Sequence, residues 1–204
     1  LMRIPRRIGW SAGGGGFLLT DTARFDPGRH EVKSRLELLR LASGDDEGTS
    51  RTYWKATRGR RRAGKCGSGQ LVSKDERTGV LHIGAGTEAK RWPAERWSQL
   101  AAMVLATGDM RVVLVGAEGD AALGAQVAAT VDDERCTSEC GLLALDELSR
   151  LIEAADVFVG CDSGPAHVAA WVGTPVVVLF SGTNSQEVWR PWGDAVRVVQ
   201  NLPE

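Results

Sequence analysis

The four residues Asp162-Ser163-Gly164-Pro165 place a carboxylate, a hydroxyl and an unhindered glycine directly ahead of a predicted helix. Proline suits the first turn of a helix, and a helix N-terminus offers unpaired N–H groups with a partial positive charge. Together these properties bind phosphate groups. Asp162 or Ser163 could instead simply cap the helix, and from these four residues alone both interpretations stay open.

Three further side chains could take part in such a site. His167 lies in the first turn after Gly164 and could hydrogen-bond a phosphate, although a structural role is equally well supported. Lys90 precedes another predicted helix and could neutralise a diphosphate; the alternative is an ordinary exposed cation. Glu118 follows a predicted strand, where a carboxylate can bind ribose hydroxyls, but exposed loop acids are just as common.

Several other nucleotide and catalytic motifs are missing from the sequence. Gly84-Ala85-Gly86 lacks the third glycine of a dinucleotide fingerprint. There is no GxxxxGK[ST] phosphate loop and no GxSxG nucleophile elbow. The sequence therefore indicates neither NAD binding, nor a P-loop nucleotidase, nor a serine hydrolase of that type.

Composition narrows the class of protein further. The 204 residues carry a formal net charge of -1, which gives no general basic field for nucleic acid. No apolar run approaches the ~18 residues of a membrane span. Cys136 and Cys140 have no second pair and no nearby histidine, so reduced thiols in a cytoplasmic protein are favoured over a zinc site; the other cysteines are Cys66 and Cys161.

Strands and helices alternate from residue 80 onward and must position these side chains. Strands predicted near residues 80–83, 111–115, 156–160 and 176–180 are largely apolar, as in a parallel sheet covered on both faces. The predicted fold class is thus α/β, with a Rossmann-like parallel sheet. Right-handed crossovers bring the strand-to-helix loops to one edge, where ligands bind. These loops are residues 84–92, 116–120, 141–144, 161–167 and 181–185.

The first 79 residues read differently. Residues 1–42 contain four consecutive glycines and one amphipathic stretch, which is too little apolar material for an independent core. Residues 43–79 are polar and aperiodic, as in a linker or a long surface loop. The basic cluster at 58–62 could contact anionic lipid, but a solvated linker is favoured because charge runs usually face water.

Three motifs resemble the ADP-heptose:lipopolysaccharide heptosyltransferases in order and spacing: Lys90-Arg91-Trp92-Pro93, Gly116-Ala117-Glu118-Gly119-Asp120 and Gly160-Cys161-Asp162-Ser163-Gly164-Pro165-Ala166-His167. The resemblance covers nearly all of residues 80–199. Residues 7–10, 16–20 and 30–32 resemble the end of that family's first domain. This resemblance implies an inverting enzyme of glycosyltransferase family 9 with the two Rossmann-like domains of the GT-B architecture.

The same resemblance implies a role for each part of the chain. Residues 1–42 would be the end of an incomplete N-terminal acceptor domain, and residues 43–79 would be a linker or surface loop. Residues 80–204 would form the donor domain without its C-terminal helices. Lys90 would contact the diphosphate and stabilise the leaving nucleotide. The implied donor contacts are Asp162, Ser163 and Gly164 at the diphosphate and sugar, Glu118 at the ribose and Leu143 at the adenine, and His167 is also expected to bind the donor.

The implied donor is ADP-heptose and the implied acceptor a lipid A–core precursor, with no cofactor and no metal. We expect a cytoplasmic protein that can contact the inner membrane peripherally. Nothing in residues 1–79 matches the aspartate proposed as the family's general base. We therefore expect a chain cut at both ends, with little transfer activity by itself. Ala144 also replaces the usual Ser/Thr cap before residue 145.

Two alternatives remain at this stage. The chain could be a non-catalytic nucleotide-binding module, or a GT-B enzyme that uses a different sugar nucleotide such as a UDP-sugar. The adenine assignment depends on Leu143 and on the resemblance alone.

Overall fold

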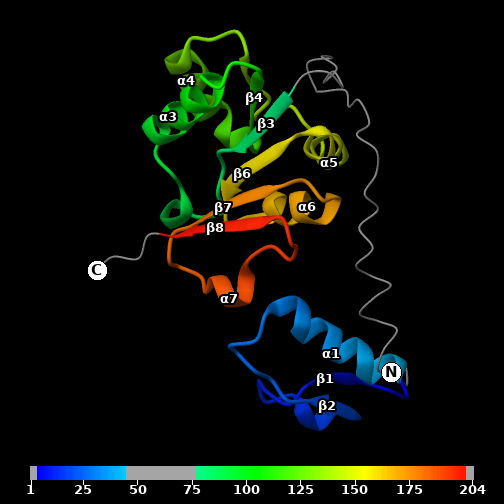
Figure 1. The fold of residues 1–204 in the computed structure, drawn as a ribbon. Coiled ribbons are helices and arrows are strands. Elements are labelled where there is room, and N and C mark those ends of the chain that lie inside the picture. Colours follow the sequence, from blue (N-terminus) through cyan, green and yellow to red (C-terminus); the bar gives the residue numbers. More distant parts are fainter. Residues whose placement is uncertain (1–3, 45–76, 201–204) are drawn as a thin grey trace. The chain divides into compact units, whose positions relative to one another are not determined.

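A computed structural model of the protein describes residues 4–44 and 77–200. The chain forms two compact units (Figure 1). The first contains the described residues 4–44 with Ser185–Trp189, and the second contains residues 77–184 and 190–200. Cys66, the basic cluster at 58–62 and most of the predicted linker lie outside the described residues.

The second unit is built on a six-stranded parallel sheet with the order β5-β4-β3-β6-β7-β8. The chain enters at β3 in the middle, adds β4 and β5 outward on one side, and then crosses to β6, β7 and β8. The switch point thus falls between β3 and β6. The strands are β3 Arg77–His82, β4 Met110–Val115, β5 Cys136–Ser138, β6 Val157–Cys161, β7 Val176–Phe180 and β8 Val196–Gln200.

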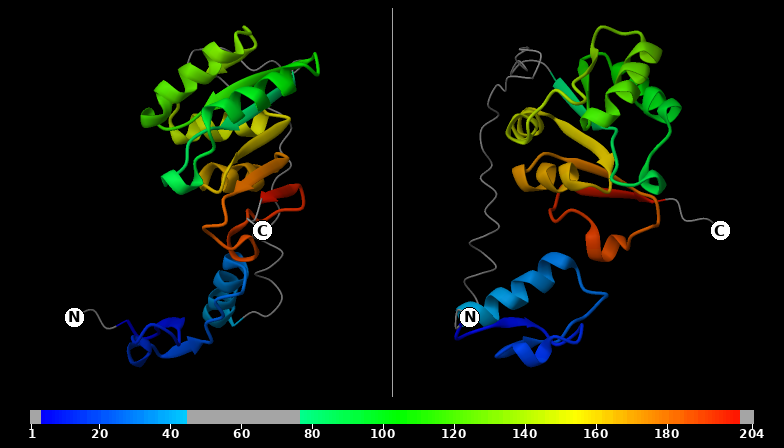
Figure 2. Two further views of the ribbon diagram at one scale, coloured as in Figure 1. Left: turned by 90° about the vertical axis from the view of Figure 1, so that its left-hand side faces the viewer. Right: turned by 180° about the vertical axis from the view of Figure 1, so that it is seen from behind.

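Helices cover both faces of this sheet, as the two opposed views show (Figures 1 and 2). Alternate residues of each strand enter different cores, because successive side chains point to opposite faces. Val80 joins the cluster beneath α5 and α6, whereas Leu81 joins the one that contains Trp97 of α3. The helices of this unit are α3 Ala94–Leu105, α4 Ala121–Val131, α5 Leu145–Ala154 and α6 Gly164–Val172, whereas the short α7 Gln186–Trp189 belongs to the first unit. The predicted α/β class is confirmed.

Most predicted elements lie where the sequence placed them, with one notable difference. β3 begins at Arg77, three residues before the predicted strand and inside the stretch expected to be a linker. Its polar start is secured by pairing rather than by apolar burial: Arg77 and Thr78 lie opposite Met110 and Arg111 of β4. The backbone N–H of Thr78 also donates to the Asp156 carboxylate at 2.9 Å.

The first residues of α5 and α1 are held by different capping contacts. Ala144 supplies no side-chain cap to α5, as expected. The reciprocal half of a capping box nevertheless remains, because the Ala144 backbone N–H donates to Glu147 Oε2 at 2.9 Å. In the first unit, α1 Glu31–Ser43 begins after His30, whose Nδ1 accepts from the Val32 N–H.

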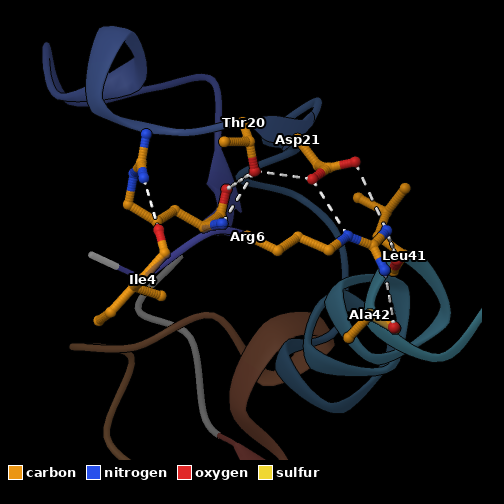
Figure 3. Close-up of polar contacts among 7 residues, drawn as sticks. Ile4, Arg6, Thr20, Asp21, Leu41 and Ala42 are labelled. Atoms are coloured by element: carbon orange, nitrogen blue, oxygen red, sulfur yellow. Dashed lines mark hydrogen bonds and ion pairs between the residues drawn. The ribbon is translucent and has the colours of Figure 1, made fainter. Parts of the chain in front are cut away.

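The first unit pairs two short parallel strands, β1 Ile8–Trp10 and β2 Asp21–Ala23, beside α1. Arg6 ties these elements together (Figure 3). Its guanidinium forms an ion pair with Asp21 at 3.2 Å and donates to the carbonyls of Leu41 and Ala42 near the end of α1. A cation there also suits the negative end of the helix dipole.

No helix among the described residues is both long and apolar enough to cross a lipid bilayer. The longest described helix, α1, has 13 residues, whereas a span needs about 20.

Candidate functional site

A cavity of about 420 Å³ opens at the carboxyl ends of β3, β4 and β6. Three of the five predicted loops contribute to its wall: residues 84–90, 117–120 and 162–165. The loops after β3 and β6 face each other there because these strands are neighbours at the switch point of the sheet. This is the position at which open α/β sheets bind ligands.

Lys90 and Asp162 join across this switch point. The Lys90 ammonium lies 2.6 Å from Asp162 Oδ2 and 3.4 Å from the Asp162 carbonyl oxygen. Asn184, in the loop after β7, donates to the same carboxylate oxygen at 2.7 Å. Asp162 is 8% exposed, so its charge is shielded from water and needs these partners. The lysine is thereby held over the start of α6.

A second buried carboxylate, Asp120, connects two walls of the cavity. It accepts the Ala117 N–H at 3.0 Å and forms an ion pair with Arg91 at 3.0 Å. Gly84 and Gly116 make room for it: a Cβ at Gly84 would overlap the Asp120 carboxylate, and one at Gly116 would lie 2.8 Å from the Asp120 Cβ. Asp120 thus fixes the loop after β4 against the loop that carries Lys90 and Arg91.

His82 and Ser163 form the third polar contact of the cavity wall. Ser163 Oγ lies 3.3 Å from His82 Nδ1 and 3.1 Å from the carbonyl oxygen of Cys161. The His82 ring stacks on Phe158. Burial lowers the pKa of His82 from its ordinary value of 6.5, against the opposite effect of the nearby Asp120 charge. The imidazole is therefore neutral at neutral pH.

The start of α6 distinguishes between the two interpretations of the Asp162-Ser163-Gly164-Pro165 sequence. Ser163 occupies the cap position, but its side chain makes no capping hydrogen bond to the helix. The Asp162 carboxylate is engaged by Lys90 and Asn184. Neither side chain serves as the helix cap that the sequence left open, and both line the cavity instead.

The predicted donor contacts divide into two groups in the structure. Lys90, Asp162, Ser163 and Gly164 all line the cavity. His167, Glu118 and Leu143 do not line it. His167 and Glu118 are exposed, and Leu143 is half-buried and packs against the hydrophobic core beneath α5 and α6. The ribose and adenine roles of Glu118 and Leu143 stay predictions.

Sequence reasoning missed His82, Asp120 and Asn184. His82 was read only as part of a strand, and Asp120 only as the end of a glycine-containing loop. The position of Gly84 and Gly116 at two strand ends was a usable signal for Asp120, because such glycines often mark a close approach of other groups. No local signal pointed to Asn184, which meets Asp162 only through the β6–β7 pairing.

The cysteines of the second unit carry no sign of chemistry. Cys136, Cys140 and Cys161 are free and buried. Burial is the main cause that raises the pKa of each thiol, to about 11 for Cys136. Such thiols stay protonated at neutral pH and are poor nucleophiles and poor metal ligands.

The fold is a Rossmann-like α/β domain whose cavity places a lysine beside a helix N-terminus. The whole chain, residues 1–204, matches the family model of glycosyltransferase family 9 (heptosyltransferase), and the chain belongs to that family.

Similarity to individual proteins is consistent with membership of this family. Lipopolysaccharide heptosyltransferase 3 of Escherichia coli is 34% identical over 106 residues, which are 52% of this chain and 31% of the relative. The structure of E. coli ADP-heptose LPS heptosyltransferase II shares 26% identity at a TM-score of 0.74, covering 98% of this chain and 63% of that one. A family 9 glycosyltransferase from Veillonella parvula DSM 2008 has the same fold, with a TM-score of 0.79 at 21% identity over 98% of this chain and 58% of that one.

The matches with curated relatives therefore cover about half of this chain and about a third of each relative.

Proposed function

We propose that this chain is the donor-binding part of an inverting glycosyltransferase, and that its cavity holds the diphosphate of an ADP-activated heptose. One observation carries the proposal: the Lys90 ammonium is fixed by Asp162 at the N-terminus of α6. A fixed cation and a helix N-terminus at one point both attract phosphate oxygens. Membership of a heptosyltransferase family supports the choice of sugar.

The hydrogen bonds of Lys90 leave capacity for a ligand. An ammonium has three N–H donors, of which two face the carboxylate and carbonyl oxygens of Asp162. The third can be donated to a phosphate oxygen. Asp162 then orients Lys90, while the Asn184 amide donates to the same carboxylate. A diphosphate beside Asp162 is tolerable because Lys90 offsets that negative charge.

In the proposed reaction the acceptor hydroxyl attacks the anomeric carbon while the bond from that carbon to the β-phosphate oxygen breaks. The configuration inverts, ADP leaves, and the hydroxyl proton passes to a general base. Lys90 and the α6 N-terminus would stabilise the charge that grows on the departing diphosphate without a metal. The general base stays predicted to lie outside these 204 residues.

The relatives support a proposal for the acceptor and for the roles of the two parts of the chain. Lipopolysaccharide heptosyltransferases 2 and 3 of E. coli match this chain, so we propose a lipopolysaccharide core precursor as the acceptor. Residues 1–42 would belong to the acceptor domain, and the residues from Arg77 onward to the donor domain. A cytoplasmic location with peripheral contact at the inner membrane stays a prediction.

Calorimetric titration of the chain with ADP, GDP and UDP tests the donor assignment. We expect ADP to bind best, and Lys90→Met to weaken ADP binding about tenfold or more because a charge-assisted hydrogen bond is lost. Arg96→Met, which removes a cation of α3 outside the cavity, should bind ADP like the wild type. Equal or better binding of UDP would defeat the adenine assignment, and no binding of any nucleoside diphosphate would defeat the donor-binding function.

A further inference from the structure

His82 is buried at the end of β3 yet borders the cavity. The side chain is 8% exposed, and its ring lies 6.4 Å from that of Phe158 at an interplanar angle of 22°. Gly160 on the neighbouring strand leaves room for this stack, because a Cβ there would lie 2.9 Å from Phe158 Cε1 and 3.2 Å from the His82 Cβ. The buried imidazole therefore packs beside Phe158 at the cavity edge.

Among the residues that the structure describes, Ser163 is the hydrogen-bond partner of that ring, and the serine has a single hydrogen to donate. Ser163 Oγ has two protein neighbours, His82 Nδ1 at 3.3 Å and the Cys161 carbonyl oxygen at 3.1 Å. If Nδ1 were an unprotonated acceptor, it would compete for the hydroxyl hydrogen. If Nδ1 carries a hydrogen, the histidine donates to Oγ and does not compete for the hydroxyl hydrogen. The Cys161 carbonyl oxygen accepts that hydrogen in this structure, and the hydroxyl can turn it to a ligand oxygen instead.

We propose that His82 is a positioning residue for donor binding: it donates Nδ1–H to Ser163 Oγ, so that the Ser163 hydroxyl donates to a phosphate oxygen of the ligand. The proposal rests on the proposed function of the cavity. A hydroxyl that accepts one hydrogen bond becomes a stronger donor in the next, so the chain His82–Ser163–phosphate is mutually reinforcing. The ligand class is a nucleoside diphosphate or its sugar ester.

The neutral state of the ring fits this role. A neutral imidazole has one N–H and one bare nitrogen, and the hydrogen can reside on Nδ1. Burial favours the neutral form, and the Asp120 carboxylate acts in the other direction. Either form that protonates Nδ1 supports the same donor chain, so the geometry and not the charge determines the effect on Ser163.

A double-mutant cycle in the full 204-residue chain, read out by ADP titration, tests the proposal. His82→Phe keeps the stacking on Phe158 but removes the donor. We expect it to weaken ADP binding by roughly three- to tenfold, the range for one lost hydrogen bond. His82→Asn, whose amide can place an N–H near the Nδ1 position, should restore most of the affinity.

Coupling to Ser163 is the decisive part of the cycle. In a Ser163→Ala background, His82→Phe should cause no further loss of ADP affinity. As a matched control, Ser98→Ala removes a buried serine hydroxyl of α3 that donates to Ala94, and its effect should be additive with that of His82→Phe.

The outcomes separate the two proposals. If wild-type chain binds ADP but His82→Phe and Ser163→Ala are additive, the role of His82 is overturned while the donor site stands. If the wild type binds no ADP, both proposals fail. Should His82→Phe not fold, the ADP affinities of His82→Asn and His82→Gln are compared instead. Retained affinity in His82→Asn together with lost affinity in His82→Gln would support the role of His82. Equal affinities of the two variants would overturn it.

Discussion

Two buried carboxylates in the cavity wall each face one cation, Asp162 with Lys90 and Asp120 with Arg91. The two basic residues are adjacent in sequence but contact different loops. Lys90 contacts the loop after β6, and Arg91 contacts the loop after β4. A buried ion pair is weak evidence for stability, since desolvation offsets much of the attraction. The Asp162–Lys90 ion pair instead positions the Lys90 ammonium where a diphosphate can reach it.

His82 gives a pH dependence at this residue scale. Burial lowers its pKa below 6.5, so in acid the unfolded chain takes up this proton before the folded protein does. Stability contributed by the neutral ring is present above the unfolded pKa and is lost as the pH falls through the folded pKa. We expect the free energy of unfolding to decrease with falling pH below 6.5, and less steeply in His82→Phe.

Denaturant unfolding of both proteins across that pH interval provides the measurement. The difference between wild type and variant isolates His82 from the other titrating groups. Parallel pH profiles for the two proteins would show that His82 does not titrate with a lowered pKa.

At the scale of elements, the loops after β3 and β4 meet around the Asp120 side chain. Gly84 follows β3, Gly116 follows β4, and both leave space for Asp120 of the short helical turn Glu118–Asp120. The third loop joins through the Gly141 N–H, which donates to the Gly116 carbonyl oxygen at 3.0 Å. Gly84 and Gly116 are required by the close approach of Asp120 rather than by backbone conformation, whereas Gly141 also has a positive φ of 78°.

Gly84→Ala should therefore damage the cavity edge. The added methyl group would overlap the Asp120 carboxylate, and overpacking of this kind costs about 1–3 kcal/mol. We expect a lower free energy of unfolding together with weaker ADP binding, because Arg91 and the Lys90 loop lose their fixed partner.

Gly119→Ala is the matched control, since nothing lies within 4 Å of a Cβ added there. Its unfolding free energy should stay close to that of the wild type in urea titrations. Equal stability of the two variants would argue against Asp120 as the steric reason for Gly84.

At the scale of the whole molecule, the net charge of -1 provides no long-range attraction for a nucleotide. Binding must come from local groups in the second unit, where the cavity lies entirely. The first unit contributes a separate set of contacts centred on Arg6, Asp21 and the end of α1.

Hydrogen–deuterium exchange with and without ADP tests this localisation. We expect slower exchange in residues 82–90, 117–120 and 162–167, with little change in β1 and β2. A ligand that binds only the native state stabilises it by about 2.7 kcal/mol at one hundred times its Kd. Protection concentrated in residues 8–23 would place the nucleotide elsewhere.

The regular elements were predictable because their signals are local. The ends of α5 and β7 agree with the apolar periodicity and with the residues that flank it. β3 was placed too late because its first residues are polar, and their strand structure depends on pairing with β4. Periodicity cannot report a strand that is held by hydrogen bonds to a distant partner.

The sequence by itself determined the parallel α/β architecture, the ligand edge of the sheet and the family, since these depend on the order and spacing of short motifs. Only the tertiary structure decided which side chains meet. Lys90 and Asp162 are 72 residues apart, and His82 faces Ser163 because β3 and β6 are neighbours. Such pairs arise from strand order, which brings together residues that carry no local signal of one another.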